Sequence, residues 1–185
     1  HCKLNDMRFI MTSKRCVTGT DRLFEVCKKI KAKHYINIQG DEPLISKKDI
    51  EKLIINIKKY PDYIINAMTP IERKLDCNKN SIPKVVVNNN NDLMYMSRSP
   101  IPGSKKNYNK KYYRQVCIYS FPQRILKRKN YYNKKTPLEK IEDIEILRFV
   151  EHGEVVKMIE VSGASIAVDF PSDLSLVKRE LNAKR

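Results

Sequence analysis

The sequence predicts a single α/β domain, because short apolar runs typical of strands alternate with amphipathic stretches typical of helices. The clearest alternation begins with an apolar run at 35–39, continues with apolar residues at helical spacing over 50–57, and returns to an apolar run at 63–68. Strand, helix and strand in this order indicate parallel crossovers. The 185 residues, of which 41% are hydrophobic, suffice for a core, so we treat 1–185 as one domain.

Two further segments of the first half carry local signals. Residues 8–12, Arg-Phe-Ile-Met-Thr, predict a core strand, and the loop at 18–22 leads into a helix whose apolar residues repeat at helical spacing. Ser46 and Asp49 form a variant capping box at the start of the next helix, whose inner stripe includes Ile54. The expected order is therefore strand, helix, strand, helix.

The second half combines a hairpin with further strands and helices. The apolar runs 84–87 and 93–96 flank an Asn-rich turn and predict a hairpin, because Asn tolerates left-handed backbone angles. Thr136, Pro137 and Glu139 supply an N-cap, a first-turn proline and a capping-box carboxylate for a helix. The elements expected after the irregular loop 99–112 are a strand at 115–121, this helix to about Val150, strands at 155–161 and 166–168, and a terminal helix from Pro171.

The composition favours a soluble cytoplasmic protein. The formal net charge is +16, but the lysines are spread along the chain without an RNA- or DNA-binding motif, so we favour solvated lysines over nucleic-acid or other polyanion binding. The five cysteines contain no C-x-x-C pair, which indicates reduced thiols and neither a disulfide nor a metal site. No apolar run reaches the roughly 20 residues that span a bilayer, so no membrane partner is expected.

Two aspartates each follow an apolar, strand-like segment. Asp41 comes after 36–39 and Asp169 after 166–168. If both strands belong to one sheet and point the same way, the two carboxylates converge at its carboxyl edge and can share a divalent cation, with magnesium and a phosphate substrate as the expected ligands. A cap of the following turn explains each aspartate equally well from spacing alone, and the role of Glu42 stays open.

Cationic and helix-start groups add weaker signals. The 18–22 loop either binds an anion through backbone N–H groups and Arg22 or is an ordinary helix N-cap. Arg98 and Arg114 each flank a predicted strand, where a guanidinium either clamps a carboxylate or phosphate or is merely solvated. None of the three histidines lies in a recognisable catalytic group, so a Cys or Ser nucleophile with a His base is not expected.

Six motifs occur in order from one end of the chain to the other. They are Met-Thr-Ser at 11–13 with Thr-Gly-Thr-Asp-Arg at 18–22, Gln-Gly-Asp-Glu-Pro at 39–43, and the segments 97–102, 118–119, 137–139 and 168–174. In this order and spacing the sequence resembles the 3-deoxy-manno-octulosonate cytidylyltransferases, the CMP-Kdo synthetase family. The resemblance implies a Rossmann-like, mostly parallel sheet with flanking helices, of the nucleotide-diphospho-sugar transferase type, and a small β element for dimerisation and sugar binding.

The resemblance also implies a reaction and a site. CTP and an eight-carbon acid sugar would give the CMP-sugar and pyrophosphate for lipopolysaccharide synthesis, through in-line attack of the anomeric hydroxyl on the α-phosphate, in a cytoplasmic homodimer. Asp41 and Asp169 would be the catalytic residues that hold Mg²⁺. The residues that the resemblance places against the nucleotide or the sugar are Met11, Thr12, Gly19, Thr20, Asp21, Arg22, Gln39, Arg98, Gln115, Tyr119 and Glu145.

The sequence departs from the family pattern at three places. It has no N-terminal strand and loop with the Arg and Lys that cradle the triphosphate, so it resembles an N-terminally truncated member, which we expect to be inactive or nearly so alone. Gln115 stands where His is commoner and Ile146 where many relatives have Gln, which favours a variant sugar such as 8-amino-Kdo or a sialic-acid-like acid. Phe170 replaces the usual Thr. The alternative from another class is a non-catalytic dimerisation or binding fragment.

Overall fold

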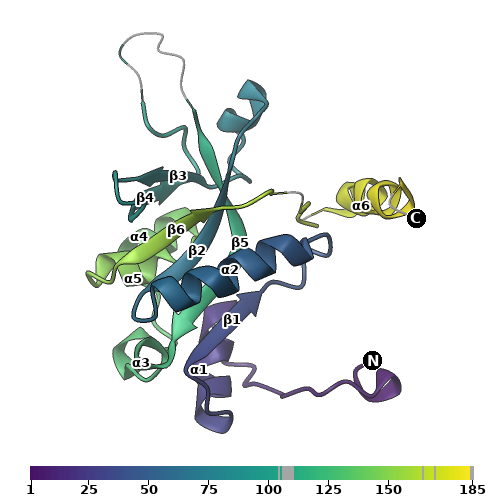
Figure 1. The fold of residues 1–185 in the computed structure, drawn as a ribbon, viewed down its shortest axis with the longest axis vertical. Coiled ribbons are helices and arrows are strands. Elements are labelled where there is room, and N and C mark those ends of the chain that lie inside the picture. Colours follow the sequence, from purple (N-terminus) through teal and green to yellow (C-terminus); the bar gives the residue numbers. More distant parts are fainter. Residues whose placement is uncertain (104, 106–110, 164, 169, 184–185) are drawn as a thin grey trace.

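The computed structural model describes residues 1–103, 105, 111–163, 165–168 and 170–183, and in these ranges the chain forms a six-stranded mixed sheet flanked by helices (Figure 1). The predicted α/β class is confirmed. The strands are β1 (His34–Ile38), β2 (Ile64–Pro70), β3 (Lys84–Val87), β4 (Leu93–Ser97), β5 (Tyr113–Pro122) and β6 (Val156–Glu160). The helices are α1 (Gly19–Lys29), α2 (Lys47–Lys59), α3 (Gln123–Leu126), α4 (Pro137–Glu142), α5 (Leu147–Glu151) and α6 (Pro171–Ala183), with 3₁₀ turns η1 (Lys3–Asn5), η2 (Lys74–Asn78) and η3 (Lys129–Tyr131).

The long strand β5 organises the sheet. The strand order is β4-β3-β5-β2-β6, and β1 also pairs with β5. Since β2 pairs along one edge of β5, β1 and β3 share the other edge, β1 at the carboxyl half and β3 at the amino end. Both β1 and β2 are antiparallel to β5 and therefore point the same way, which agrees with the predicted crossover through α2.

The described pairing is nevertheless mixed and not mostly parallel. Of the described pairs, β2–β6 is parallel and the other four are antiparallel. The reason is that β5 is inserted antiparallel between β1 and β2, an arrangement that local sequence patterns do not reveal.

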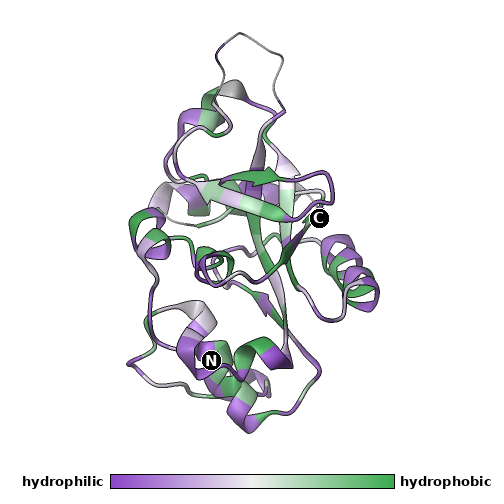
Figure 2. Ribbon diagram, turned by 90° about the vertical axis from the view of Figure 1, so that its left-hand side faces the viewer, coloured by the Kyte–Doolittle hydropathy of each residue, from purple (hydrophilic) through white to green (hydrophobic). Residues whose placement is uncertain are grey.

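The two faces of the sheet pack against different helices. On one face Leu53 of α2 packs with Ile65 and Ile118, and on the other Phe24 of α1 packs with Phe121 and Phe149. In Figure 2 the strands are coloured mainly hydrophobic, whereas the helices show one hydrophobic and one hydrophilic side. Burial of both faces of the sheet by helices is what the alternation of strand and helix patterns predicts.

Several local predictions are confirmed. Thr18 forms a capping box with Asp21, the third helical residue of α1, and the Ser46 hydroxyl caps α2 by accepting the N–H of Asp49. At α4 the Glu139 carboxylate accepts the Thr136 N–H at 3.2 Å. The hairpin β3–β4 forms, with Asn91 at a φ of 58° in its turn. These are the positions where side-chain chemistry alone decides the backbone.

Other predictions are wrong. Residues 8–12 form no strand, because no neighbouring strand offers them a ladder among the described residues, and Phe9 and Met11 are 47% and 76% exposed. The helix expected from Pro137 to Val150 is broken into α4 and α5 at Asp143, which adopts a left-handed conformation. Residues 166–168 also form no strand, and Ile54 is 42% exposed on the outer side of α2.

Among the described residues, no helix combines the length and the apolar character needed to cross a bilayer.

A fully buried ion-pair cluster ties three helices together. The Arg148 guanidinium of α5 donates to Asp21 of α1 at 2.6 Å and to both carboxylate oxygens of Glu139 in α4 at 2.7 and 2.8 Å. All three side chains are 0% exposed. Burial raises the pKa of Asp21, but hydrogen bonds from Arg148 and from the Asn133 N–H outweigh it, so the pKa is lowered and the carboxylate stays ionised.

We predict that Arg148→Met destabilises the fold by about 3–5 kcal/mol, because it leaves two buried carboxylates without their cation. Urea unfolding followed by circular dichroism measures the change. The matched control is Arg124→Met, which removes a half-exposed guanidinium from its pair with Glu154 and is expected to cost about 1 kcal/mol or less. Equal losses of unfolding free energy in the two variants would contradict the stabilising role of the buried Arg148 cluster.

Candidate functional site

A cavity of about 1340 Å³ opens beyond the carboxyl end of β1. Its wall is formed by the N-terminus of α1, the ends of β1 and β4, the first half of β5 and residues 165–167. The predicted site residues that line it are Gly19, Arg22, Gln39, Asp41, Arg98, Gln115, Tyr119 and Glu145. The crevice at the carboxyl end of sheet strands is the usual ligand site of open α/β proteins.

Asp41 lies in this wall directly after β1, as predicted. The carbonyl oxygen of Asp41 accepts the backbone N–H of Val168 at 2.8 Å. This bond brings the segment 165–168 to the end of β1 although residues 41 and 168 are far apart in the chain. The predicted metal partner Asp169 lies outside the described residues, and the pairing of the two carboxylates stays a prediction.

Glu145 occupies the N-terminus of α1. Its two carboxylate oxygens accept the backbone N–H groups of Gly19 at 3.1 Å and Thr20 at 2.7 Å. The N–H groups offered for an external anion are thus already bonded to an internal one, so the structure favours the N-cap alternative for 18–22. A Cβ at Gly19 would lie 3.5 Å from Oε1, which is an ordinary van der Waals contact.

Four predicted site residues do not line the cavity. Thr20 and Asp21 are buried at the start of α1, where Asp21 serves the Arg148 cluster. Thr12 accepts a hydrogen bond from Arg22 at 2.6 Å, and Met11 is exposed. These four residues lie outside the lining of the cavity, and their predicted contact with the nucleotide stays a prediction.

Arg98 is held at the cavity by backbone carbonyls. Its guanidinium donates to the carbonyl oxygens of Asn80 at 2.9 Å, Glu142 at 2.5 Å and Asp143 at 3.1 Å. An arginine has five N–H groups, so two remain for a ligand. Arg98 therefore joins the 79–83 loop to the end of α4 and still presents donors to the cavity.

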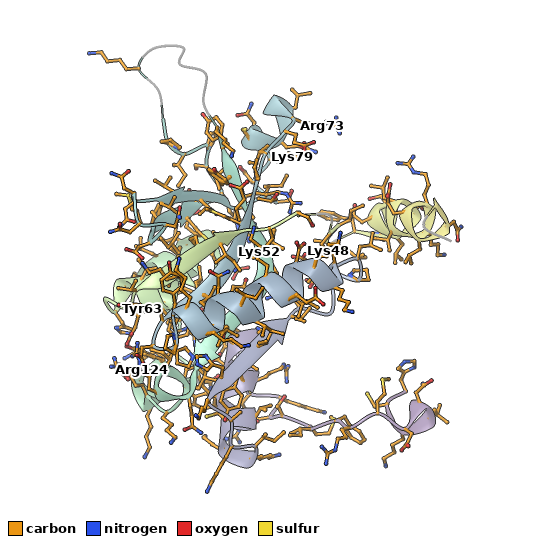
Figure 3. All side chains as sticks on the ribbon, viewed as in Figure 1. Lys48, Lys52, Tyr63, Arg73, Lys79 and Arg124 are labelled. Atoms are coloured by element: carbon orange, nitrogen blue, oxygen red, sulfur yellow. The ribbon has the colours of Figure 1, made fainter. Side chains whose placement is uncertain are left out.

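Four guanidinium groups line the cavity without an ion-pair partner in the described part of the chain: Arg22, Arg73, Arg98 and Arg114. By contrast, Lys79 and Lys135 of the same wall are paired with Asp76 and Asp143. Figure 3 shows Arg73 and Lys79 projecting from the two ends of η2. Unpaired guanidinium groups are planar donors suited to phosphate and carboxylate anions.

Gln115 is fixed from behind by β2. Its side-chain N–H donates to Asn66 Oδ1 at 2.9 Å, and the Asn66 amide in turn donates to the carbonyl oxygens of Val116 and Ile118, both at 3.0 Å. Asn66 lies at the bulge in the β2–β5 ladder, whose free carbonyls it satisfies. Ile146, the other predicted departure, is 1% exposed in the apolar core and does not line the cavity.

Sequence reasoning assigned no role to three residues that shape this site. Glu142 accepts the Ser97 hydroxyl at 2.7 Å, the Tyr95 hydroxyl at 3.2 Å and the Arg98 N–H at 2.8 Å. Lys84 is fully buried and donates to the carbonyl oxygens of Arg98 and Lys79, and burial lowers its pKa. In the sequence, Glu142 and Lys84 stand out only as charged residues inside or beside apolar segments. This pattern does not indicate which groups they bind.

The third is Glu42, which is 5% exposed and lines the cavity. Its Oε1 accepts the Cys117 N–H at 2.9 Å, whereas its Oε2 has no hydrogen-bond partner among the described residues. The Ser165 hydroxyl, also in the cavity wall and 6% exposed, is likewise unpartnered there. Buried polar atoms are nearly always paired, so such groups indicate a ligand-binding wall.

An α/β sheet that ends in an arginine-lined cavity with a strand-terminal aspartate is the arrangement of a nucleotidyltransferase. A family model described as cytidylyltransferase matches residues 1–161, and the chain belongs to this family. It is 34% identical over 169 residues to the 3-deoxy-manno-octulosonate cytidylyltransferase of Escherichia coli, covering 91% of this chain and 68% of the relative. It is 39% identical over 176 residues to the enzyme of that name from Fusobacterium nucleatum subsp. nucleatum, covering 91% of this chain and 69% of the relative.

The fold comparison agrees. A solved structure of a CMP:2-keto-3-deoxy-manno-octonic acid synthetase complexed with CTP superimposes with a TM-score of 0.91 at 32% identity, covering 99% of this chain and 76% of that one. HddC from Yersinia pseudotuberculosis, at 13% identity and a TM-score of 0.65, covers 95% of this chain and 67% of that one and shows the shared fold only. The Rossmann-like nucleotidyltransferase architecture implied by the sequence is thereby confirmed.

We predict that Glu142→Gln makes the free energy of unfolding less dependent on pH in the acid range. Partial burial raises the pKa of Glu142, but hydrogen bonds from the Arg98 N–H and the Ser97 and Tyr95 hydroxyls outweigh it, so the folded pKa lies below the ordinary value of 4.5. A lowered folded pKa adds stability above the unfolded pKa, and this is lost as pH falls through the folded value. The variant should lose about 1–3 kcal/mol near neutral pH, and this deficit should shrink as the pH falls through the folded pKa of Glu142.

Urea unfolding at about pH 7 and at about pH 3.5 tests this prediction. The control Glu72→Gln removes an exposed carboxylate outside the cavity lining and should follow wild type at both pH values. A constant deficit of Glu142→Gln at both pH values would instead indicate a loss of packing.

Proposed function

We propose that this chain transfers the cytidylyl group of CTP to the anomeric hydroxyl of 3-deoxy-manno-octulosonate (Kdo) or a close relative, giving the CMP-sugar and pyrophosphate. The observation that carries the proposal is the cavity at the end of β1, whose wall includes Asp41 and the four guanidinium groups that have no ion-pair partner within the described residues. The relatives named for this reaction and the CTP-complexed neighbour support it. Cytoplasmic supply of activated sugar for lipopolysaccharide follows from the same likeness.

The chain's own groups suit this reaction. CTP and the acid sugar are both anions, and Arg22, Arg73, Arg98 and Arg114 offset their charge and hold them against each other. The anomeric oxygen forms a bond to the α-phosphorus as the bond to pyrophosphate breaks, so no covalent protein nucleophile is needed. Positioning and charge neutralisation are therefore the whole contribution required of the cavity.

Mg²⁺ is the proposed cofactor, with Asp41 and Asp169 as the residues that would hold it. The donor set fits, because Mg²⁺ prefers carboxylate oxygens from one or two residues and completes its shell with phosphate and water. The Val168–Asp41 bond supports the pairing, since it anchors the residue before Asp169 at the end of β1. When bound, Mg²⁺ would neutralise charge that develops on the phosphate oxygens.

The acid sugar itself stays open between Kdo, 8-amino-Kdo and a sialic-acid-like acid. Gln115 supports a variant sugar because it lines the cavity in a position where relatives more often have His. Ile146 gives no support, because it is packed in the core. We also propose a homodimer that uses the β3–β4 hairpin, on which Met94 is 59% exposed.

We predict that the chain binds CTP in a Mg²⁺-dependent manner and that Asp41→Asn weakens this binding at least about tenfold, because it removes a carboxylate ligand. Isothermal titration calorimetry with CTP, with and without Mg²⁺, measures the effect. Asp62→Asn is the control, since Asp62 is exposed and does not line the cavity.

The same titrations separate the two classes of function. A non-catalytic dimerisation fragment would give no heat with CTP and Mg²⁺ and no binding of Kdo. Pyrophosphate release in the presence of CTP, Mg²⁺ and each candidate sugar then measures turnover, and the sugar that gives the fastest release is the preferred substrate.

A further inference from the structure

The free oxygen of Glu42 is fixed in place and points to a ligand. The bond from the Cys117 N–H to Oε1 holds the carboxylate in one orientation. The side chain is 5% exposed in the cavity wall, and Oε2 makes no hydrogen bond within the described residues. A buried, oriented acceptor is available to a donor that arrives with a substrate.

Two other carboxylates of the cavity wall, Glu145 and Asp41, are assigned to other contacts. Both oxygens of Glu145 accept N–H groups of α1, and Asp41 is the residue proposed to hold Mg²⁺. In Glu42, Oε1 accepts a backbone N–H of β5, and Oε2 makes no hydrogen bond within the described residues. This leaves Oε2 as an acceptor for substrate groups, whereas the arginines are suited to the anionic groups.

The groups next to Glu42 on β5 are neutral. Burial raises the pKa of the Cys117 thiol, and the charge of the Glu42 carboxylate and a hydrogen bond between the thiol and Glu42 raise it further. Burial likewise raises the pKa of the Tyr119 phenol well above its ordinary range. A neutral thiol is a weak hydrogen-bond donor, so Cys117 competes poorly with a hydroxyl or an ammonium group for Oε2.

We propose that Glu42 is a specificity-determining residue whose Oε2 accepts a hydrogen bond from a donor group, a hydroxyl or an ammonium, on the acid sugar. The proposal rests on the proposed function of the cavity. It assigns recognition of the sugar's donors to Glu42 and recognition of its carboxylate to the guanidinium groups. Acid sugars that lack the matching donor are then rejected, because the buried oxygen stays unpaired.

The first test is Glu42→Gln, in which the amide oxygen can still accept the Cys117 N–H while an NH₂ group replaces Oε2. We expect the dissociation constant for Kdo, measured calorimetrically in the presence of CTP and Mg²⁺, to rise at least about tenfold while that for CTP changes less than about twofold. Glu51→Gln on the exposed side of α2 removes the same charge away from the cavity and should change neither constant.

Kdo analogues that each lack one hydroxyl identify the donor. The analogue without the paired hydroxyl should bind wild type about tenfold more weakly than Kdo and bind Glu42→Gln no more weakly than Kdo does. Additive losses for every analogue would overturn the proposal. If 8-amino-Kdo binds wild type more tightly than Kdo and loses this advantage in the variant, the donor is the ammonium group.

A pair of variants at Cys117 keeps the test decisive if Glu42→Gln does not fold. Cys117→Ser places a stronger donor beside Oε2 that competes with the sugar, so it should bind Kdo more weakly than Cys117→Ala does. Equal affinities of the Ser and Ala variants would count against the proposal.

The outcomes distinguish this inference from the proposed function. If wild type binds neither CTP nor any acid sugar, the proposed function fails and the role of Glu42 fails with it. If wild type binds both and Glu42→Gln retains its sugar affinity, only the role of Glu42 is wrong. A loss confined to Mg²⁺-dependent CTP binding would show that Glu42 serves the metal and not the sugar.

Discussion

The buried contact of Arg148 with Asp21 and Glu139 is the constraint on which the site depends. Asp21 and Glu139 are also the capping-box carboxylates of α1 and α4, so one guanidinium fixes the starts of two helices relative to α5. Three residues before Arg148, Glu145 reaches the N-terminus of α1. The wall of the cavity is therefore positioned by a charge cluster that lies behind it and contacts no solvent.

The strand β5 supplies the second constraint. It lies between β2 on one edge and β1 and β3 on the other, and it contributes Gln115, Cys117 and Tyr119 to the cavity. The bulge opposite Asn66 would leave backbone carbonyls of β5 unpaired, and the Asn66 amide satisfies them. A substitution at Asn66 would thus reach the cavity through Gln115, although Asn66 itself is buried in the sheet.

Local elements were predictable from sequence where side chains act on their own backbone. The caps of α1, α2 and α4 and the hairpin turn depend on residues within a few positions of one another, and these predictions are confirmed. The antiparallel insertion of β5 and the absence of a strand at 8–12 depend on which segments meet in space. Asp41 was found because it follows a strand, whereas Glu142 and Lys84 gain their roles only from contacts with the Arg98 loop.

The charges of the cavity explain why so basic a chain need not bind polyanions. Most lysines are solvated, but Arg22, Arg98 and Arg114 of the cavity are placed by carbonyl and hydroxyl contacts that leave donors free, as the three carbonyls around Arg98 illustrate. The carboxylates of the same wall are placed by N–H groups, as at Glu145 and Glu42. Because Arg98, Glu145 and Glu42 are held by backbone groups and not by opposite charges, the cavity keeps both donors and acceptors available for a ligand that carries anionic and hydroxyl groups together.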